Sequence, residues 1–449
     1  MRIAGLYSGF APGTPAPKPD SGFSQKDFAY RASIPAYASS IVVHGPSLLN
    51  GSSRAALNTR DAVYYERTSL VSGGQLEIRT YFHRTRRNLI VVEVEVDCTQ
   101  CTESTQVLLR ALSHSQVSDV VFQRRDAGGA ASPRQLIGKL RTPENCEPSV
   151  SHLYDTNHTL GYVHDICPES ISAAPGERAT VQLLSALTLS SEHLSTSKES
   201  VVLHAMRVYE DAKRTSATQL LNEHRQGWAT LWDGGGIELS TTDLALQQTT
   251  NSTLYYLLMS TRPDWLHSTM VPSTIAAAAP YPHGYDGHVF WDQETFQAPP
   301  LMVFYPDVAK NLLRNRLFQL PAYRINAQAF GLKGAYVPWE VGFSGGFARD
   351  NLVNHEEVHV AGDIALFIKQ YYQLSRNSTE LREFFPLLED IADFVTSRIN
   401  RTDENGWFSI ENIVAPDEST GKSILPVASC LDVVARYDSD AAAFSLSLT

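Results

Sequence analysis

Alternation of apolar and polar residues dominates the first two hundred positions of the chain. Residues 92–96 read Val-Glu-Val-Glu-Val, the period of two that a strand with one buried face shows. The same alternation runs through residues 76–82, and short apolar runs follow at 107–109 and 181–184. Short strands separated by turn residues are typical of a large antiparallel β-sandwich, which we predict for this part of the chain.

The hydrophobic period changes near residue 205. Residues 208–232 and 244–260 are helical in pattern. Further on, apolar residues recur every three or four positions in three segments. They are Ala309, Leu312, Leu313, Leu317 and Leu320; Ile364, Phe367, Ile368, Tyr371 and Tyr372; and Phe384, Leu387, Leu388, Ile391 and Val395. Pro306 marks the start of the first of these helices, and Pro386 is expected near the opening turn of the third.

The two patterns predict a multidomain protein with β-structure first and α-structure after it. We place an N-terminal β-sandwich at residues 1–205, a helical linker at 206–265 and a helical domain at 266–449. Long loops rich in aromatic and charged residues separate the C-terminal helices. Loops on a rigid scaffold often carry function, so the candidate chemistry is sought there.

Composition narrows the class of protein. The chain has 449 residues, 43% of them hydrophobic and 19% charged, as in a globular protein that buries several cores. Its net charge of −11 is dispersed, whereas phosphate binding needs a clustered basic face, so we expect no nucleic-acid partner. No apolar run approaches the ~18 residues of a membrane helix, so we expect no membrane association through such a helix.

Indications of the compartment point in two directions. The first residues of the chain lack the apolar core of a secretory signal, which slightly favours the cytoplasm. Five N-glycosylation sequons leave a secretory or lysosomal location open. They begin at Asn50, Asn157, Asn251, Asn377 and Asn400. Cys98 and Cys101 form a single CxxC, and a local disulfide or two free thiols fits it better than zinc, which normally needs a second ligand pair.

Two aromatic–carboxylate pairs stand out in the C-terminal part. Trp291-Asp292 lies within residues 288–294, and Trp339-Glu340 lies in a loop flanked by Gly and Pro. An aromatic ring can cover the apolar face of a pyranose, while a carboxylate accepts hydrogen bonds from neighbouring hydroxyls. A single pair also fits a buried Trp beside a helix-capping acid. Two pairs in comparable loops favour opposite walls of a sugar pocket.

Two further clusters carry acids. Residues 355–359 read His-Glu-Glu-Val-His, a HExxH string that in zinc proteases places two histidines one helical turn apart. No third ligand is evident, so helix-start acids, or a carboxylate and an imidazole that bind sugar hydroxyls, are the alternatives. Residues 415–418 read Ala-Pro-Asp-Glu, which is either a turn or the loop of a glycosidase proton donor in a partly desolvated pocket.

Together these segments resemble glycoside hydrolase family 65. The segments that follow its pattern are GHVFWDQET at 287–295, the helix at 311–316, PWE at 338–340, 357–359 with 362–364, and Pro-Asp-Glu at 416–418. Residues 4–9 are similar to a stretch of its sandwich domain, and residues 228–232 to its linker helices. The resemblance covers most of residues 1–418.

The resemblance implies a β-sandwich, a helical linker and a partial (α/α)6 barrel at 266–449, with the active site at the barrel mouth. It implies that Glu418 is the general acid and that no metal or cofactor takes part. The residues implied to bind the terminal glucosyl unit, or to line the same pocket, are Trp291, Asp292, Trp339, Glu340, Glu357 and His359.

Family members cleave α-glucosides by a single displacement with inversion. A second carboxylate activates water in the hydrolases, and bound phosphate takes its place in the phosphorylases. The wording PWEVGFSG at 338–345 is similar to members that remove glucose from the glucosyl-galactosyl-hydroxylysine of collagen, so we expect a glycan of that type as substrate. The alternatives are an acid trehalase, a disaccharide phosphorylase, or a carbohydrate-binding chain without catalysis.

The resemblance stops after Glu418. A barrel of about twelve helices needs well over ~300 residues, whereas residues 266–449 number fewer than two hundred. We therefore expect an incomplete copy of the family scaffold, with apolar helix faces uncovered and without the second carboxylate or phosphate site. Little or no hydrolase activity is expected of such a chain.

Overall fold

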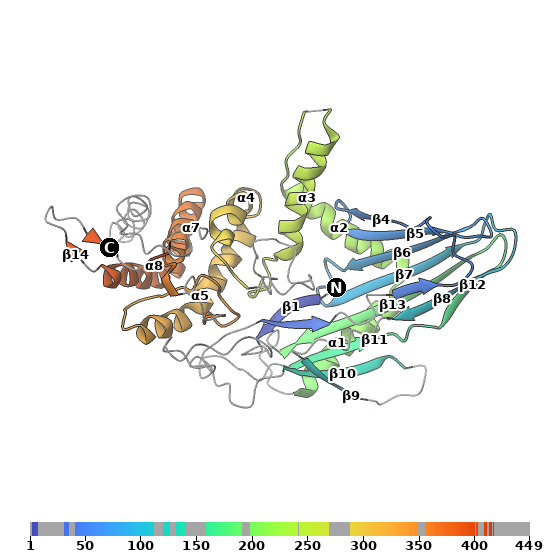
Figure 1. The fold of residues 1–449 in the computed structure, drawn as a ribbon, viewed down its shortest axis with the longest axis horizontal. Helices are drawn as coiled ribbons and strands as arrows, with labels where there is room; N and C mark the ends of the chain where they lie inside the picture. Colours follow the sequence, from blue (N-terminus) through green and yellow to red (C-terminus); the bar gives the residue numbers. More distant parts are fainter. Residues whose placement is uncertain are drawn as a thin grey trace. The chain divides into compact units, whose positions relative to one another are not determined.

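Figure 1 shows the computed structural model of the chain. The residues that the structure describes are 2–7, 31–35, 41–111, 120–125, 132–140, 159–190, 198–240, 242–268, 288–348, 355–399, 401–402, 408–410, 413–414 and 416. The chain divides into two compact units. The first comprises Met1–Ile3, Ile34–Arg141 and Asn157–Tyr255, and the second comprises Ala4–Ser33, Thr142–Thr156 and Tyr256–Thr449. The domain boundaries placed at 205 and 265 stay a prediction.

The first unit is built on antiparallel sheets, as the alternating residues predict (Figure 1). One sheet has eight strands in the order β4-β5-β6-β7-β13-β11-β10-β9, and another has three in the order β12-β8-β3. Apart from these two sheets, β1 pairs with β2, and most residues of this pair belong to the second unit. The strands are β1 (Arg2–Tyr7), β2 (Arg31–Pro35), β3 (Ile41–His44), β4 (Arg54–Asn58), β5 (Val63–Ser69), β6 (Gln75–Phe82), β7 (Leu89–Asp97), β8 (Thr105–Ala111), β9 (Val120–Arg124), β10 (Arg134–Leu140), β11 (Thr159–His164), β12 (Ser170–Ala173) and β13 (Arg178–Leu189).

Two apolar clusters cover the two faces of the eight-stranded sheet. Val92, Val94 and Val96 of β7 pack against the three-stranded sheet, and Leu89 and Val91 point the other way, against helices α1 and α2. These helices are α1 (Lys198–Arg214) and α2 (Ala217–Gly234). Because strand residues alternate between faces, one strand contributes to both cores. The predicted antiparallel sandwich is confirmed.

The helical stretch expected at 208–232 differs in detail from the structure. It starts earlier, at Lys198, and a break after Arg214 divides it into α1 and α2. The hydroxyl of Ser216 accepts a hydrogen bond from the backbone N–H of Gln219 at 3.2 Å and thereby starts a new helix. The apolar period continues through the break, so periodicity alone does not reveal it.

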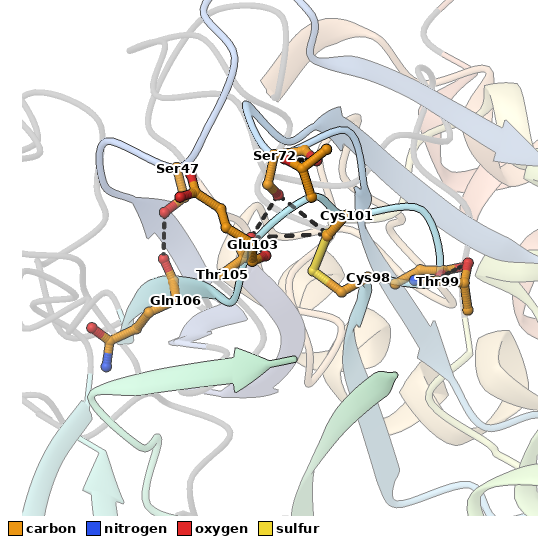
Figure 2. Close-up of a disulfide and its surroundings, with 10 residues drawn as sticks. Ser47, Ser72, Cys98, Thr99, Cys101, Glu103, Thr105 and Gln106 are labelled. Atoms are coloured by element: carbon orange, nitrogen blue, oxygen red, sulfur yellow. Dashed lines mark hydrogen bonds between the residues drawn. A yellow bond between two sulfur atoms is a disulfide. The ribbon is translucent and has the colours of Figure 1, made fainter. Parts of the chain in front are cut away.

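The CxxC at the end of β7 forms a disulfide between Cys98 and Cys101, the first of the two alternatives that the sequence left open (Figure 2). The hydroxyl of Ser72 donates to Cys101 Sγ at 3.2 Å and lies 2.6 Å from the hydroxyl of Thr105. Figure 2 shows these side chains gathered around the bridge. The disulfide therefore closes the turn after β7, and the hydrogen bonds of Ser72 join the turn before β6 to it.

Two buried histidines hold α2 against the sheet. His83 Nε2 donates to the carbonyl of Leu220 at 2.9 Å, and its Nδ1 accepts from the backbone N–H of Arg86 at 3.1 Å. His224 accepts at Nδ1 from the N–H of Arg84 at 3.1 Å, and its Nε2 lies 3.3 Å from a backbone carbonyl. Each ring acts as donor and acceptor at once, which only the neutral imidazole can do.

Acidification is expected to weaken the first unit through these two rings. Burial, helped by a neighbouring positive charge, lowers the pKa of both His83 and His224 to about 4. An unfolded histidine titrates near ~6.5, so between these two pKa values the unfolded chain binds more protons than the folded chain. The free energy of unfolding therefore decreases as the pH is lowered. We expect urea unfolding to show a loss of about 2–3 kcal/mol from about pH 7.5 to about pH 5.5. The double variant His83→Gln, His224→Gln is the control, and an unchanged pH slope in it would exclude the two rings as the cause.

The second unit contains helices and short loops. Its elements are η4 (Gln293–Gln297), α4 (Ala298–Phe304), α5 (Pro306–Ala329), α7 (Val360–Ser375), α8 (Ser378–Arg398), β14 (Arg401–Thr402) and β15 (Phe408–Ser409), and α3 (Leu244–Ser260) begins in the first unit and ends in this one. The helices predicted at 244–260 and from Pro306 are confirmed. Among the described residues, no helix has both the length and the apolar character needed to cross a bilayer.

The position expected for Pro386 is wrong. Helix α8 begins at Ser378, because the side-chain oxygen of Asn377 accepts hydrogen bonds from the N–H groups of Thr379 and Glu380 and caps the helix there. Pro386 therefore lies inside the helix and not in its opening turn. The cap precedes the first apolar residue of the period, so the period gave too late a start.

Candidate functional site

The two segments that carry the aromatic–carboxylate pairs lie side by side in the second unit. Val289 and Val341 form an antiparallel bridge, with backbone N–O distances of 3.0 and 2.9 Å. Val341 also pairs with Phe347 across a turn in which Gly345 has φ +101°. Only glycine adopts this conformation without strain, so the turn fits Gly345 and folds the loop back on itself.

Side chains on either side of the bridge meet each other. His288 Nδ1 lies 2.8 Å from Glu340 Oε1, and both side chains are buried. The rings of Phe290 and Trp339 are perpendicular, with centroids 4.9 Å apart. Trp339 and Glu340 are therefore held against residues 288–290, directly before Trp291 and Asp292.

Helix α5 anchors the loop through buried amide side chains. Gln319 Nε2 donates to the carbonyls of Gly342 and Phe343 at 3.1 and 3.2 Å. Two turns further along the helix, Asn326 Nδ2 donates to the carbonyls of Tyr336 and Gly345 at 3.2 and 3.1 Å. A buried carbonyl without a partner costs free energy, so these bonds stabilise the conformation of the whole loop.

A buried ion pair fixes the segment on the other side of the bridge. Arg316 of α5 meets Glu294 in a two-point contact, with Nε–Oε1 and Nη2–Oε2 distances of 2.9 and 2.8 Å, and both side chains have an exposed fraction of 0%. Burial opposes the charge of Arg316, but Glu294 outweighs it and the pKa of Arg316 is raised. Arg316 also donates to the hydroxyl of Tyr323, which donates to Gln319 Oε1 at 2.6 Å. One hydrogen-bonded chain thus links η4 to the loop beyond Trp339.

His359 lies between two carboxylates at the start of α7. Its Nδ1 is 2.6 Å from Asp363 Oδ2 and its Nε2 is 2.7 Å from Glu357 Oε1. Burial alone would lower the pKa of His359, but the hydrogen bonds to Asp363 and Glu357 raise it to about 9. Its ring is perpendicular to that of Trp291, with centroids 4.9 Å apart. The structure thus brings Trp291, Glu357 and His359 together.

Asp292 follows Trp291 and is partly buried. Its pKa is raised, first by burial and further by the charges of Glu294 and Asp363, while its own backbone and His359 act in the opposite direction. The ring of Trp291 also contacts the exposed ring of Phe296 at 5.3 Å between centroids. Asp292 therefore lies within electrostatic range of the His359 cluster.

Two expectations from the sequence concern Glu418 and the HExxH string at residues 355–359. Glu418 lies outside the described residues, so its position relative to Trp291 and Trp339 stays a prediction. Helix α7 begins only at Val360, so residues 355–359 are not one continuous helix of the kind that the zinc motif requires. In the described part of the chain, no group of three or more His, Cys, Asp or Glu side chains is placed to hold a metal ion.

Three residues that the site depends on were not predicted. Glu294 and Arg316 form the buried ion pair, and Asp363 holds His359. A signal existed for Asp363, because it follows His359 by four positions and such pairs share one side of a helix. For Arg316, the signals were its place in the segment 311–316 of the family pattern and its charge among the apolar positions of α5, and neither assigns it a partner.

Part of this second unit is similar to a known protein family. Residues 267–435 match the family described as "Glycosyl hydrolase family 65 central catalytic domain", which confirms the resemblance seen in the sequence.

Three named proteins are similar to parts of this chain. The chain is 29% identical over 381 residues to a protein-glucosylgalactosylhydroxylysine glucosidase of Dictyostelium discoideum, covering 81% of this chain and 50% of that one. It is 36% identical over 206 residues to a kojibiose hydrolase of Flavobacterium johnsoniae, covering 45% and 29%, and 32% identical over 231 residues to a kojibiose phosphorylase of Escherichia coli, covering 48% and 30%. The chain spans half the length of the first of these relatives, and less of the other two.

A solved structure shows the same fold. The chain is similar to the protein titled "Putative kojibiose phosphorylase from human microbiome", with a TM-score of 0.72 and 13% identity, over 99% of this chain and 63% of that one. The predicted fold class, antiparallel β-structure followed by helices of the (α/α)6 type, is thereby confirmed.

Proposed function

We propose that this chain binds the terminal glucosyl unit of an α-glucoside and cleaves its glycosidic bond with inversion. The observation that carries the proposal is the bridge between Val289 and Val341, which sets the segments of Trp291-Asp292 and Trp339-Glu340 beside each other. Aromatic rings and carboxylates at one place suit the apolar face and the hydroxyls of a pyranose. The match of residues 267–435 to a glycosyl hydrolase catalytic domain supports the same function.

In this proposal Trp291 covers one face of the glucose ring and Asp292 accepts hydrogen bonds from its hydroxyls. Glu357, His359, Trp339 and Glu340 line the same site. Glu418 gives its proton to the glycosidic oxygen as the bond breaks, and water attacks the anomeric carbon from the opposite face. A second carboxylate, for which no residue of this chain is assigned, would take the proton of that water. A single displacement of this kind inverts the configuration at that carbon.

The substrate we propose is the glucosyl-galactosyl-hydroxylysine of collagen-type glycans. It is supported by the Dictyostelium relative, which aligns with most of this chain, and by the wording of residues 338–345. Relatives named kojibiose hydrolase and kojibiose phosphorylase support a second candidate, the cleavage of a glucosyl disaccharide by water or by phosphate.

Product analysis separates these candidates. The purified chain is incubated with glucosyl-galactosyl-hydroxylysine, kojibiose and trehalose, with and without phosphate, and free glucose and glucose 1-phosphate are measured. Release of glucose from the first substrate, however slow, whether or not phosphate is present would support the hydrolase. Glucose 1-phosphate formed only with phosphate would support the phosphorylase, and binding of glucose without any product would support a carbohydrate-binding chain.

Glucose binding tests the site itself. Trp291→Ala is expected to weaken glucose binding about tenfold or more, because the apolar face of the sugar loses its aromatic partner. Isothermal titration calorimetry measures this effect without any need for turnover. Trp265→Phe is the control, since the ring of Trp265 contacts His267, which is not one of the predicted sugar residues. Equal affinity in the Trp291 and Trp265 variants would contradict the assignment.

A further inference from the structure

Asp363 shares its carboxylate with the ring of His359 at the start of α7. The two residues are four positions apart, the backbone N–H of Asp363 donates to the carbonyl of His359 at 3.0 Å, and the side chains meet at 2.6 Å. Asp363 is 8% exposed and His359 5%. Both ends of this contact are therefore fixed, by the helix backbone on one side and by burial on the other.

The arrangement requires a particular protonation state of His359. Its ring faces a carboxylate oxygen at each nitrogen, Asp363 on one side and Glu357 on the other. A neutral imidazole has one N–H, so it could donate to only one of them, whereas the imidazolium donates to both. Two short hydrogen bonds from opposite sides also remove the freedom of the ring to flip or tilt.

Other charges face this group from the neighbouring elements. Asp292, next to η4, lies near His359, and Glu294 of η4 is neutralised by Arg316 of α5. The ring of Trp291 stands perpendicular to the imidazolium at 4.9 Å. Among the described residues, His359 thus contacts the ring that is predicted to be the glucose platform.

We propose that Asp363 is a positioning residue of the sugar site: with Glu357 it holds His359 as an imidazolium in one orientation, and His359 in turn fixes the ring of Trp291. The proposal rests on the proposed function in so far as Trp291 binds glucose. Asp363 itself touches no substrate. Its effect reaches the sugar through the ring of His359 and then through the ring of Trp291. Of these two rings, His359 is the one that titrates.

A spectroscopic titration tests the contact without substrate. A protonated imidazole quenches the fluorescence of an adjacent indole, so the emission of Trp291 should rise as His359 loses its proton, with a midpoint near 9. Subtracting the titration of Trp291→Phe isolates this signal from the other tryptophans. In Asp363→Asn the midpoint should fall by more than about one pH unit, because one carboxylate no longer stabilises the cation.

A control matches the change in charge and helix position. Asp307→Asn makes the same substitution in the first turn of α5, at an exposed aspartate. It should leave the midpoint unchanged and glucose affinity intact, whereas Asp363→Asn should weaken glucose binding about tenfold. Circular dichroism on each variant establishes that it is folded.

The outcomes separate the two proposals. A Trp291 signal in the parent chain that does not titrate, or that keeps its midpoint in Asp363→Asn, overturns the role of Asp363 whatever sugar is bound. Equal glucose affinity of the parent chain and of Asp363→Asn also overturns this role. A shifted midpoint in a chain that binds no sugar supports the role of Asp363 in fixing the ring of Trp291. This outcome contradicts only the proposed function.

Discussion

Replacing Glu294 by glutamine is expected to lower the free energy of unfolding of the second unit by about 3–5 kcal/mol, because it leaves the buried cation of Arg316 without its counter-charge. Glutamine keeps the size of the side chain and can still accept one hydrogen bond from Arg316. The loss therefore reports on charge and not on volume. Urea unfolding followed by circular dichroism measures it.

An exposed pair between another arginine of α5 and an acid of α8 provides the control. Arg314 and Glu383 meet in the same two-point geometry, at 2.6 and 3.2 Å, but with side-chain exposed fractions of 44% and 31%. Water already solvates these charges, so Glu383→Gln should cost about 0–1 kcal/mol. Equal losses for the two glutamine variants would mean that burial of Arg316 does not set the energy of the pair.

A double variant tests whether the charge or the packing matters. Arg316→Met together with Glu294→Gln removes the isolated cation and keeps an apolar chain of similar length in its place. Such replacements are often much less harmful than the loss of one partner, so part of the stability should return. The return should stay partial, because Arg316 also donates toward the carbonyl of Phe290, at 3.4 Å, and to Tyr323.

The fold follows from hydrophobic periodicity because both cores of the first unit are built from alternating residues. Val92, Val94 and Val96 predict β7 and one of its packed faces, and the structure agrees. The alternation does not reveal that the other face is buried as well, against α1 and α2. Periodicity fails where a cap interrupts it, as at Ser216 and Asn377, because one or two hydrogen bonds accepted by a side-chain oxygen decide where a helix begins.

The candidate site was only partly predictable for a different reason. The aromatic–carboxylate pairs are local, so they can be found in the sequence. Their partners are distant, since Arg316 reaches a residue 22 positions away and His288 one 52 positions away. Helix α5 also buries polar side chains on its packed surface. The buried polar residues of α5 are Asn311, Asn315, Arg316, Gln319 and Asn326. A pattern that assigns faces by apolar residues treats these as exceptions, although they hold the loops in place.

Replacing Glu418 by glutamine is expected to lower the turnover of an unactivated α-glucoside by about 10²–10⁴-fold, the usual contribution of a positioned general acid. Glutamine matches the shape of the side chain and can occupy the same space, but it has no proton to give to the glycosidic oxygen. Glucose binding should change little, since the proposed contacts to the sugar come from Trp291 and Asp292. Initial rates and calorimetric affinities, measured on the same preparation, check both parts.

The nature of the leaving group makes the test specific to acid catalysis. Fluoride departs without a proton, so α-glucosyl fluoride should lose much less of its rate in Glu418→Gln than glucosyl-galactosyl-hydroxylysine does. Asp417→Asn, one position away in the same Pro-Asp-Glu loop, is the matched control and should retain both rates within about tenfold. If Glu418→Gln slows both substrates by the same factor, the residue acts on the fold or on attack by water. If Asp417→Asn shows the selective loss instead, the proton donor is the neighbouring acid, and the position taken from the family pattern is off by one.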